Sequence, residues 1–229
     1  MVVSSSTAEA GRRLPIVVLL SGRGSNFAAI AAAAASGALA VDIRAVLSDR
    51  HGAAGLSRAR ALGLPAECIP AADYPDRASH DAALAARIDA YQPGLVVLAG
   101  YMRVLDPAFI AHFAGRLVNI HPSLLPEFRG LDTHRRALAA RTAWHGCTVH
   151  FVTDELDAGP LIAQARIAVR ADDTEASLAA RVQAREHVLY PQVIGWFATG
   201  RLHERAGRAW LDGRPLTMPV MLEDADDRR

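Results

Sequence analysis

Asn119 and His121 are the two residues of this 229-residue chain whose types and spacing best suit chemistry. They stand two positions apart in the run Val118–Pro122, so both side chains project from the same face of an extended strand. Pro122 cannot donate a ladder hydrogen bond and is expected to end that strand. An amide donor beside an imidazole suits a reaction in which negative charge grows on a carbonyl oxygen while a proton moves nearby. A hydrogen-bonded, purely structural histidine is the alternative.

Asp157 is a third candidate for this chemistry. It lies in the turn-rich acidic segment Asp154–Pro160. A carboxylate on such a loop can reach an imidazole and raise its pKa by favouring the charged form. Asp154 and Glu155 are expected to be solvated, and an entirely exposed loop is the alternative.

The segment Gly22–Asn26 has the composition of a phosphate-binding turn. It follows a strongly apolar run and precedes an alanine-rich helical segment, so backbone N–H groups and the helix dipole converge there. Phe27 occupies the position where the dinucleotide fingerprint requires a third small residue. A short glycine turn can be purely structural, but Ser25 and Asn26 add side-chain donors that favour phosphate binding.

The elements that must position these residues alternate along the chain. Strands are expected over Ile16–Leu20, Asp42–Leu47, Ala66–Ile69, Leu95–Ala99, Leu117–Ile120, Cys147–Val152 and Leu161–Val169. Helices are expected over Asn26–Ala35, Ala54–Leu62, Arg77–Ala90, Pro107–Ala114, Thr133–Ala140, Thr174–Tyr190 and Gln192–Ala198, with Pro191 separating the last two, and a hairpin over Trp210–Arg214. This order predicts an α/β fold with right-handed crossovers and a mostly parallel sheet, whose ligands bind at the carboxyl ends of the strands.

Composition limits the classes of function. With 51% hydrophobic and 21% charged residues, the chain can bury one full core. A net charge of +1 does not indicate a surface that binds nucleic acid or an anionic membrane. No apolar run is long enough to approach a membrane span. Cys68 and Cys147 form no redox or zinc motif, and the histidines lack metal-ligand spacing, so no metal is expected. Residues 1–13 contain no signal-peptide core and are expected to be a disordered extension, and a cytoplasmic location is the default.

Seven blocks of sequence together resemble the phosphoribosylglycinamide formyltransferases of purine synthesis, a folate-dependent family. They occur in order between about Leu14 and Leu216, and they are Ser21–Asn26, Val97–Arg103, Asn119–Pro126, Gly130–His134, His145–Val152, Asp154–Pro160 and Glu186–Pro191. The resemblance implies a Rossmann-like twisted sheet with helices on both faces, in a single domain over residues 14–216. Residues 14–118 would form the ribonucleotide-phosphate half and 119–216 the folate and catalytic half, followed by a C-terminal tail over 217–229.

The resemblance also implies roles for individual residues. Those matching positions that contact the ribonucleotide are Gly24, Ser25, Asn26, Gly100, Gln183 and Glu186. Those matching positions that hold the formyl donor, 10-formyltetrahydrofolate, are Arg77, Met102, Arg103, Val104, Leu105, Asn119, Val152, Thr153, Asp154 and Asp157. Asn119, His121 and Asp157 match the catalytic trio, in which a protonated His121 and Asn119 stabilise an oxyanion and Asp157 keeps the imidazole charged. The implied partners are small molecules, with a monomer or homodimer as the assembly.

Two positions depart from the family pattern. Asp132 stands where histidine is common, so a second carboxylate is expected either near the active-site network or facing solvent. Arg129 replaces a commoner proline before Gly130 and is expected to be a neutral loop change.

Three rival functions remain from the sequence. A formyltetrahydrofolate deformylase shares the Asn-x-His and Asp residues but usually has a preceding regulatory domain, for which the thirteen residues before the matched region are expected to be too few. A methionyl-tRNA formyltransferase would need a second C-terminal domain and a basic surface. A non-catalytic nucleotide-binding module would leave Asn119, His121 and Asp157 unexplained.

Overall fold

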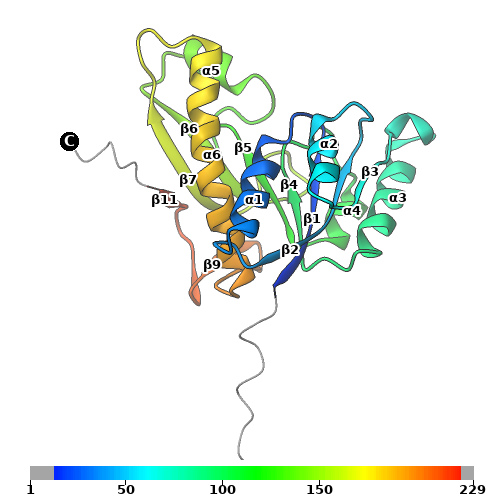
Figure 1. Cartoon of the computed structure of the whole chain (residues 1–229). Helices are drawn as coiled ribbons and strands as arrows, with labels where there is room; N and C mark the ends of the chain where they lie inside the picture. The colour runs from blue at the N-terminus through cyan, green and yellow to red at the C-terminus, as the bar shows by residue number, and fades with distance from the viewer. Residues whose placement is uncertain (1–12, 223–229) are drawn as a thin grey trace, which may run out of the picture.

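Buried β-branched runs build an eight-stranded sheet within residues 13–222, the part of the chain that this computed structural model describes. The strand order is β11-β7-β6-β5-β4-β1-β2-β3 (Figure 1). The bounds are β1 Leu14–Leu20, β2 Val41–Ser48, β3 Ala66–Cys68, β4 Leu95–Leu98, β5 Leu117–His121, β6 Trp144–Phe151, β7 Leu161–Ala168 and β11 Val220–Leu222. β6 runs antiparallel to β5 and β7, whereas every other neighbouring pair is parallel. The expected mostly parallel sheet is therefore confirmed.

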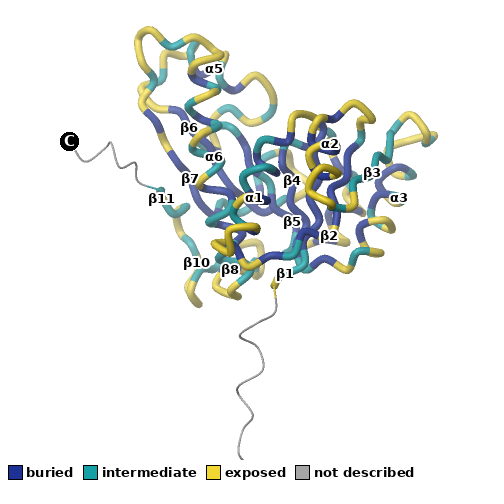
Figure 2. The backbone as a smooth tube through the Cα atoms, viewed as in Figure 1, coloured by how far each residue is buried: buried dark blue, intermediate teal, exposed yellow. Residues whose placement is uncertain are grey.

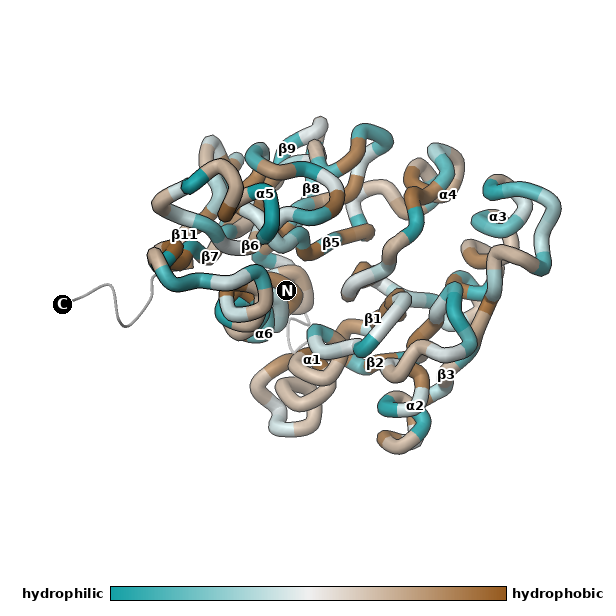
Figure 3. Tube along the Cα trace, turned by 90° about the horizontal axis from the view of Figure 1, so that it is seen from above, coloured by the Kyte–Doolittle hydropathy of each residue, from teal (hydrophilic) through white to brown (hydrophobic). Residues whose placement is uncertain are grey.

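Helices cover both faces of this sheet, as predicted (Figure 3). Their bounds are α1 Ser25–Ala35, α2 Ala54–Ala61, η1 Ala71–Asp73 (a 3-10 turn), α3 Arg77–Asp89, α4 Pro107–His112, α5 Thr133–Ala139 and α6 Glu175–Ala198. α1, α2 and α6 pack on the face to which Ile16 and Val18 of β1 point, and α3 and α4 pack on the face of Val17 and Leu19. All four of these β1 side chains are fully buried. A strand buried on both faces is apolar throughout, which is why this run lacks alternation.

Pro191 does not end a helix, so the prediction of two helices separated at this residue is wrong. α6 continues through it from Glu175 to Ala198. An internal proline removes one hydrogen bond and costs about 3 kcal/mol or more. The helix persists because side chains on both sides of the proline, Leu189, Tyr190 and Val193 among them, are buried against the sheet. Tertiary packing here outweighs the local preference.

The C-terminal segment forms a small antiparallel sheet with strands β8 Leu202–Arg205, β9 Arg208–Leu211 and β10 Arg214–Pro215. The predicted hairpin is present, since Leu211 pairs with Arg214 across a two-residue turn whose φ angles are both positive. β8 was not predicted. The expected tail over 217–229 needs a correction, because Val220–Leu222 form β11 beside β7. A three-residue strand is too short to give a periodic signal.

Two terminal predictions lie outside the described residues: positions 1–12 of the expected extension and 223–229 of the expected tail. Within residues 13–222, no helix is both long and apolar enough to span a membrane. Figure 2 shows the central strands buried and the exposed positions concentrated in the loops and on the outer sides of the helices.

The chain order of the strands sets the place of the site. From β1 the sheet grows outward through β2 and β3 on one side and through β4 and β5 on the other. At such a switch point the connections leave in opposite directions and open a crevice at the carboxyl ends of the strands. The Gly22–Asn26 turn after β1, Gly100 after β4 and His121 at the end of β5 therefore meet at one edge.

Candidate active site

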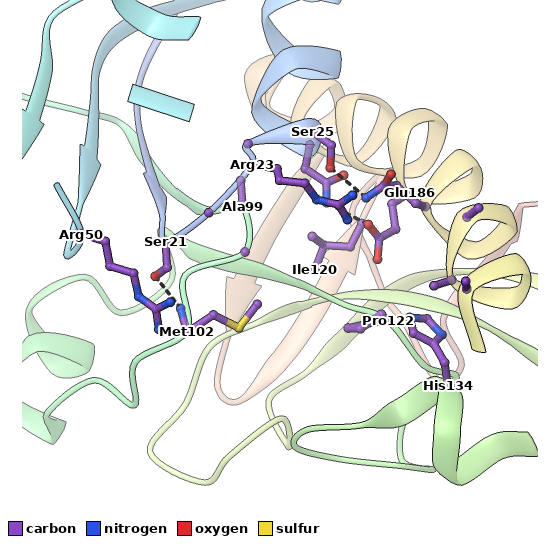
Figure 4. Close-up of a pocket in the computed structure, with 18 residues that line it drawn as sticks. Ser21, Arg23, Ser25, Arg50, Ala99, Met102, Ile120, Pro122, His134 and Glu186 are labelled. Atoms are coloured by element: carbon purple, nitrogen blue, oxygen red, sulfur yellow. Dashed lines mark hydrogen bonds between the residues drawn. The ribbon is translucent and has the colours of Figure 1, made fainter. Parts of the chain in front are cut away.

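A cavity of about 670 Å³ lies at the carboxyl ends of β1 and β4, between the turn after β1 and helix α6. Its lining includes all six residues expected to contact a ribonucleotide, namely Gly24, Ser25, Asn26, Gly100, Gln183 and Glu186. Two hydrogen bonds join α1 to α6 across it: Asn26 Nδ2 donates to Glu186 Oε2 at 2.8 Å, and Gln183 Nε2 donates to Ser25 Oγ at 3.0 Å. Figure 4 shows Ser25 beside Glu186, with Arg50 and His134 toward opposite sides of the view.

Gly24 gives the turn its shape. Its φ of 70° lies in the left-handed region, and a Cβ at this position would stand 2.8 Å from Gly55 Cα. It occupies the N-cap position of α1, where no side-chain cap is made. The first N–H groups of the helix are therefore left for an anion in the cavity.

Arg23 and Arg50 also line the cavity, and sequence reasoning missed both as site residues. Arg50 has an exposed side chain whose Nε lies 3.7 Å from Asp49 Oδ2. Two guanidinium groups in the lining add positive charge to that of the helix N-terminus, which makes the cavity suitable for a phosphate. Arg23 lies within the Gly22–Asn26 segment, so its place in that turn was a usable signal, whereas Arg50 belongs to no motif and is brought to the cavity only by the fold.

Glu186 is the buried acidic group of this cavity. Burial raises the pKa of its carboxyl group, and the hydrogen bond from Asn26 opposes that rise. A carboxylate here can accept hydrogen bonds from hydroxyl or amine groups of a bound molecule.

The three predicted catalytic residues come together at the end of β5. His121 Nδ1 lies 3.4 Å from Asp157 Oδ2, and His121 Nε2 lies 3.0 Å from the carbonyl oxygen of Phe128, to which it donates. The N–H of Gly130 donates to the same Asp157 oxygen at 2.9 Å. Both imidazole nitrogens thus face oxygen acceptors, an arrangement that the doubly protonated ring satisfies.

His150 is a further member of this group that sequence reasoning listed only as lacking metal-ligand spacing. Asn119 Nδ2 lies 3.2 Å from His150 Nε2, and His150 Nδ1 lies 2.8 Å from the carbonyl oxygen of Phe151. Burial lowers the pKa of His150, with Asp157 opposing at 3.8 Å, so the ring is held neutral with its proton on Nδ1. The neutral ring accepts one N–H of Asn119 and leaves the second amide N–H for a ligand. The register of the antiparallel pair β5 and β6 places Asn119 opposite His150.

A second cavity, of about 100 Å³, opens beside Asn119 and Asp157. It is lined by eight of the residues expected to hold the formyl donor, namely Arg103, Val104, Leu105, Asn119, Val152, Thr153, Asp154 and Asp157. The other two residues expected to hold the formyl donor do not line this cavity. Met102 lines the larger cavity, and Arg77 stands at the start of α3 with Nη2 4.0 Å from Asp106 Oδ2.

Asp132 lies outside the catalytic network. Its side chain is half exposed and forms an ion pair with Arg135. Of the two placements expected from sequence, the solvent-facing one is found. Arg129 likewise stands at the surface, where its Nη1 pairs with Glu155 Oε1 at 2.6 Å.

His134 and His145 form a second imidazole pair near the site, with His134 Nδ1 3.1 Å from His145 Nε2. His134 lines the larger cavity, whereas His145 is fully buried. Burial lowers the pKa of His145 to about 4, and the neighbouring histidines add to this shift. Both rings are neutral at neutral pH because the pKa of His134 is also lowered by burial. No cluster of three or more potential metal ligands occurs within residues 13–222.

Comparison with known proteins identifies the family that this geometry belongs to. A family model described as formyl transferase matches residues 14–194. The chain is a member of the formyl transferase family. It is 52% identical to the phosphoribosylglycinamide formyltransferase of Escherichia coli strain K12, over 88% of this chain and 95% of that protein. The corresponding Haemophilus influenzae protein is 39% identical over the same shares of the two chains.

Solved structures within the formyl transferase family have the same fold. The phosphoribosylglycinamide formyltransferase of Coxiella burnetii aligns with a TM-score of 0.87 at 50% identity, covering 91% of this chain and 99% of that one. A formyltetrahydrofolate deformylase from Burkholderia mallei aligns with a TM-score of 0.79 at 29% identity, covering 87% of this chain and 70% of that one. The deformylase is thus less similar to this chain than the Coxiella formyltransferase is, in both sequence identity and TM-score.

Proposed function

We propose that the protein transfers the formyl group of 10-formyltetrahydrofolate to the amine of 5-phosphoribosylglycinamide in purine biosynthesis. The observation on which this rests is the anion-binding turn in a cavity whose lining also includes Ile120 and Pro122, the two residues that flank His121 in the sequence. Asn119 and Asp157 line the second cavity, and Asp157 lies 3.4 Å from His121. The names of relatives that match over nearly their whole length support the same activity.

The ribonucleotide would bind in the larger cavity. Its phosphate would accept hydrogen bonds from the N–H groups of the Gly24–Asn26 turn, with Arg23 and Arg50 supplying positive charge. Gln183 and Glu186 of α6 would contact the remaining polar groups, Glu186 as an acceptor. The substrate amine would then point toward the end of β5.

The formyl donor would bind along Arg103–Leu105 and Val152–Asp157, with Arg77 and Met102 at the margins. Asn119 would contact the formyl oxygen through the amide N–H that His150 does not use. The formyl carbon would then lie between the two cavities, in reach of the amine.

The reaction would then proceed by direct attack. As the new bond forms between the amine nitrogen and the formyl carbon, negative charge grows on the formyl oxygen, and Asn119 and His121 donate hydrogen bonds to it. The bond from N10 to the formyl carbon then breaks, and the amine proton passes through water, assisted by Asp157, to N10. In the structure His121 Nε2 donates to Phe128, so that hydrogen bond must be exchanged for one to the formyl oxygen.

A deformylase would use the same trio with water as the acceptor. The residues that line the larger cavity favour transfer instead, because hydrolysis needs no phosphate-binding turn. The cytoplasmic location and the monomeric or dimeric state expected from the sequence remain predictions.

One assay separates these functions. Purified protein is mixed with 10-formyltetrahydrofolate, with and without 5-phosphoribosylglycinamide, and both tetrahydrofolate and formylated ribonucleotide are quantified. We expect tetrahydrofolate release to require the ribonucleotide and to match its formylation one for one. Release of formate at the same rate without the ribonucleotide would contradict the proposal and identify a deformylase.

A further inference from the structure

Residues 101–106 connect β4 to α4, and this segment is attached to the body of the protein at both ends. At its start the N–H of Met102 donates to Ser21 Oγ at 2.9 Å, and Ser21 Oγ donates to the buried Asp49 Oδ1 at 2.5 Å. At its end the N–H of Asp106 donates to Asp81 Oδ2 at 2.7 Å. Between these two attachments lie Arg103, Val104 and Leu105, which line the smaller cavity.

The second attachment comes from a fully buried pair on α3. Asp81 and His80 are 1% and 0% exposed, and His80 Nδ1 lies 2.7 Å from Asp81 Oδ1. His80 Nε2 lies 3.0 Å from the carbonyl oxygen of Ile69. Each carboxylate oxygen of Asp81 therefore has one partner, the imidazole for Oδ1 and the backbone of Asp106 for Oδ2. A buried carboxylate is retained only where its partners offset its desolvation.

Asp106 is held on its side chain as well. Its carboxylate accepts from the N–H of Ala108 at 2.9 Å and caps α4, and Arg77 Nη2 approaches the other oxygen at 4.0 Å. Arg77 and Asp81 stand four residues apart on α3 and so share one face of the helix. One face of α3 thus contacts Asp106 twice: Asp81 accepts from its backbone N–H, and Arg77 lies near its carboxylate.

Tyr101 completes the buried side of the segment. Burial raises the pKa of its phenol, and the carboxylates of Asp49 and Asp81 add to that rise. Its hydroxyl group is buried without a hydrogen-bond partner among the described residues. Tyr101 lines the smaller cavity together with Arg103, Val104 and Leu105, whereas His80 and Asp81 do not. The hydrogen bond from Asp106 therefore connects Asp81 to that cavity through this segment.

We propose that Asp81, held by His80, is a positioning residue that fixes residues 103–105 for binding of the formyl donor. This inference rests on the proposed function, because it assigns the smaller cavity to the donor. It predicts that disturbing Asp81 weakens binding of the folate and leaves binding of the ribonucleotide unchanged. A merely structural role would weaken both substrates together.

The first test compares Asp81→Asn with Asp89→Asn. Asp89 pairs with His112 Nε2 at 2.7 Å between the same two helices, but both side chains are half exposed, so this variant removes an equivalent pair away from the segment. We expect Asp81→Asn to raise the KM for 10-formyltetrahydrofolate about ten-fold, because the amide has one acceptor oxygen where the carboxylate has two and carries no charge, so the charge-assisted hydrogen bond from Asp106 is lost. The KM for the ribonucleotide should stay within about two-fold, and Asp89→Asn should change neither.

The second test removes only the donor of the hydrogen bond. Asp106 has φ −70° and ψ 145°, which proline adopts without strain, so Asp106→Pro deletes the N–H that Asp81 accepts. Asp106→Ala keeps that N–H but loses the helix cap and the carboxylate near Arg77, so it is the matched control. The KM for the donor should rise further in Asp106→Pro than in Asp106→Ala. This pair decides the question if Asp81→Asn does not fold.

The same variants are also measured by equilibrium binding of tetrahydrofolate, which reports on the donor site without turnover. A dissociation constant that rises in Asp81→Asn and Asp106→Pro, but not in their controls, supports the inference. Equal losses for both substrates, or unchanged donor binding in both variants, would overturn it. Failure of the proposed function is distinguishable, because then the wild-type protein itself would not formylate the ribonucleotide.

Discussion

At the scale of single residues, the chemistry depends on which oxygen or nitrogen faces each ring nitrogen. His121 faces Asp157 through Nδ1 and the Phe128 carbonyl through Nε2, whereas His150 accepts from Asn119 and donates to a backbone carbonyl. Two imidazoles on adjacent strands are therefore suited to different charge states. In the proposed reaction His121 would therefore stabilise the growing charge, and His150 would hold the amide of Asn119 in place.

The first residue-scale prediction concerns the catalytic trio. In His121→Ala and in Asp157→Ala we expect kcat to fall by ~10²–10³-fold, the usual effect of losing one oxyanion donor or its support. The KM values for both substrates should change little, because the cavities are lined mainly by other residues. Asp132→Asn serves as the control, since its carboxylate is half exposed and pairs with Arg135. Steady-state kinetics measures all three, and a near-normal kcat in either trio variant would remove the role assigned to that residue.

The second residue-scale prediction concerns pH and the buried His145. Its pKa falls from 6.5 to about 4 on burial, so between these values the unfolded chain binds more protons than the folded protein. Stability from this residue is therefore complete above pH 6.5 and is lost as the pH falls toward 4. The loss amounts to about 1–3 kcal/mol.

Urea unfolding at pH 7 and pH 5 checks this prediction. The free energy of unfolding should fall less between the two pH values in His145→Phe than in the wild type, because phenylalanine does not titrate. His134, His150 and His187 also have lowered pKa values and remain in both proteins, so the comparison reports on His145 together with its contact to His134. An identical pH dependence in the two proteins would show that His145 is already charged or accessible.

At the scale of elements, the turn after β1 depends on one glycine in two ways. Gly24 supplies a left-handed φ and allows Gly55 to approach, while Gly63 has a similar φ of 72° with no atom within 4 Å of a built Cβ. The two positions therefore separate conformational cost from steric cost. The left-handed φ is a local property of each glycine. The steric cost at Gly24 arises only because Gly55, a residue distant in the sequence, packs against it.

The element-scale prediction uses this pair. Gly63→Ala should lower the free energy of unfolding by about 1–2 kcal/mol, the cost of a left-handed alanine. Gly24→Ala should lower the free energy of unfolding by more than that, because its methyl group would meet the backbone of Gly55, which cannot move aside as a flexible side chain could. The KM for the ribonucleotide should also rise, because the backbone N–H groups of the turn would shift. Chemical unfolding and steady-state kinetics measure the two effects. Equal destabilisation with an unchanged KM would mean that the turn neither packs nor binds as described.

At the scale of the whole molecule, hydrogen bonds between distant elements fix the walls of the larger cavity, to which the proposed function assigns the ribonucleotide. The hydrogen bonds Asn26 to Glu186 and Ser25 to Gln183 link α1 with α6 across 160 and 158 positions. Tyr190 on α6 donates its hydroxyl proton to the carbonyl oxygens of Leu98 and Val118 at 2.9 and 3.1 Å, and so ties the helix to β4 and β5. The cavity walls are thus fixed by the core.

A thermal-shift titration tests this preformed state. We expect 5-phosphoribosylglycinamide alone to raise Tm, because a ligand that binds only the folded state stabilises it by about 2.7 kcal/mol at one hundred times its Kd. A parallel titration with 10-formyltetrahydrofolate reports on the smaller cavity. If the ribonucleotide stabilised the protein only when the folate was also present, the cavity would not be preformed.

Much of the fold and part of the site were predictable because their signals are local. Buried runs such as Ile16–Leu20, the glycine turn and the Asn119-x-His121 spacing each depend on residues close in sequence, where periodicity and backbone preference act. The family resemblance extended this to Gln183 and Glu186, which line the expected cavity. The continuous helix through Pro191 was not predictable, because distant packing decides it.

The sequence by itself determined the types of chemical group at the site and the strands and turns that present them, since both are properties of neighbouring residues. Only the tertiary structure decided which groups meet. The antiparallel register of β5 and β6 brings His150 to Asn119 across 31 positions, and the packing of α3 brings Asp81 to the backbone of Asp106 across 25. The physical reason is that such contacts depend on strand register and helix packing, which the core sets as a whole and no short segment encodes.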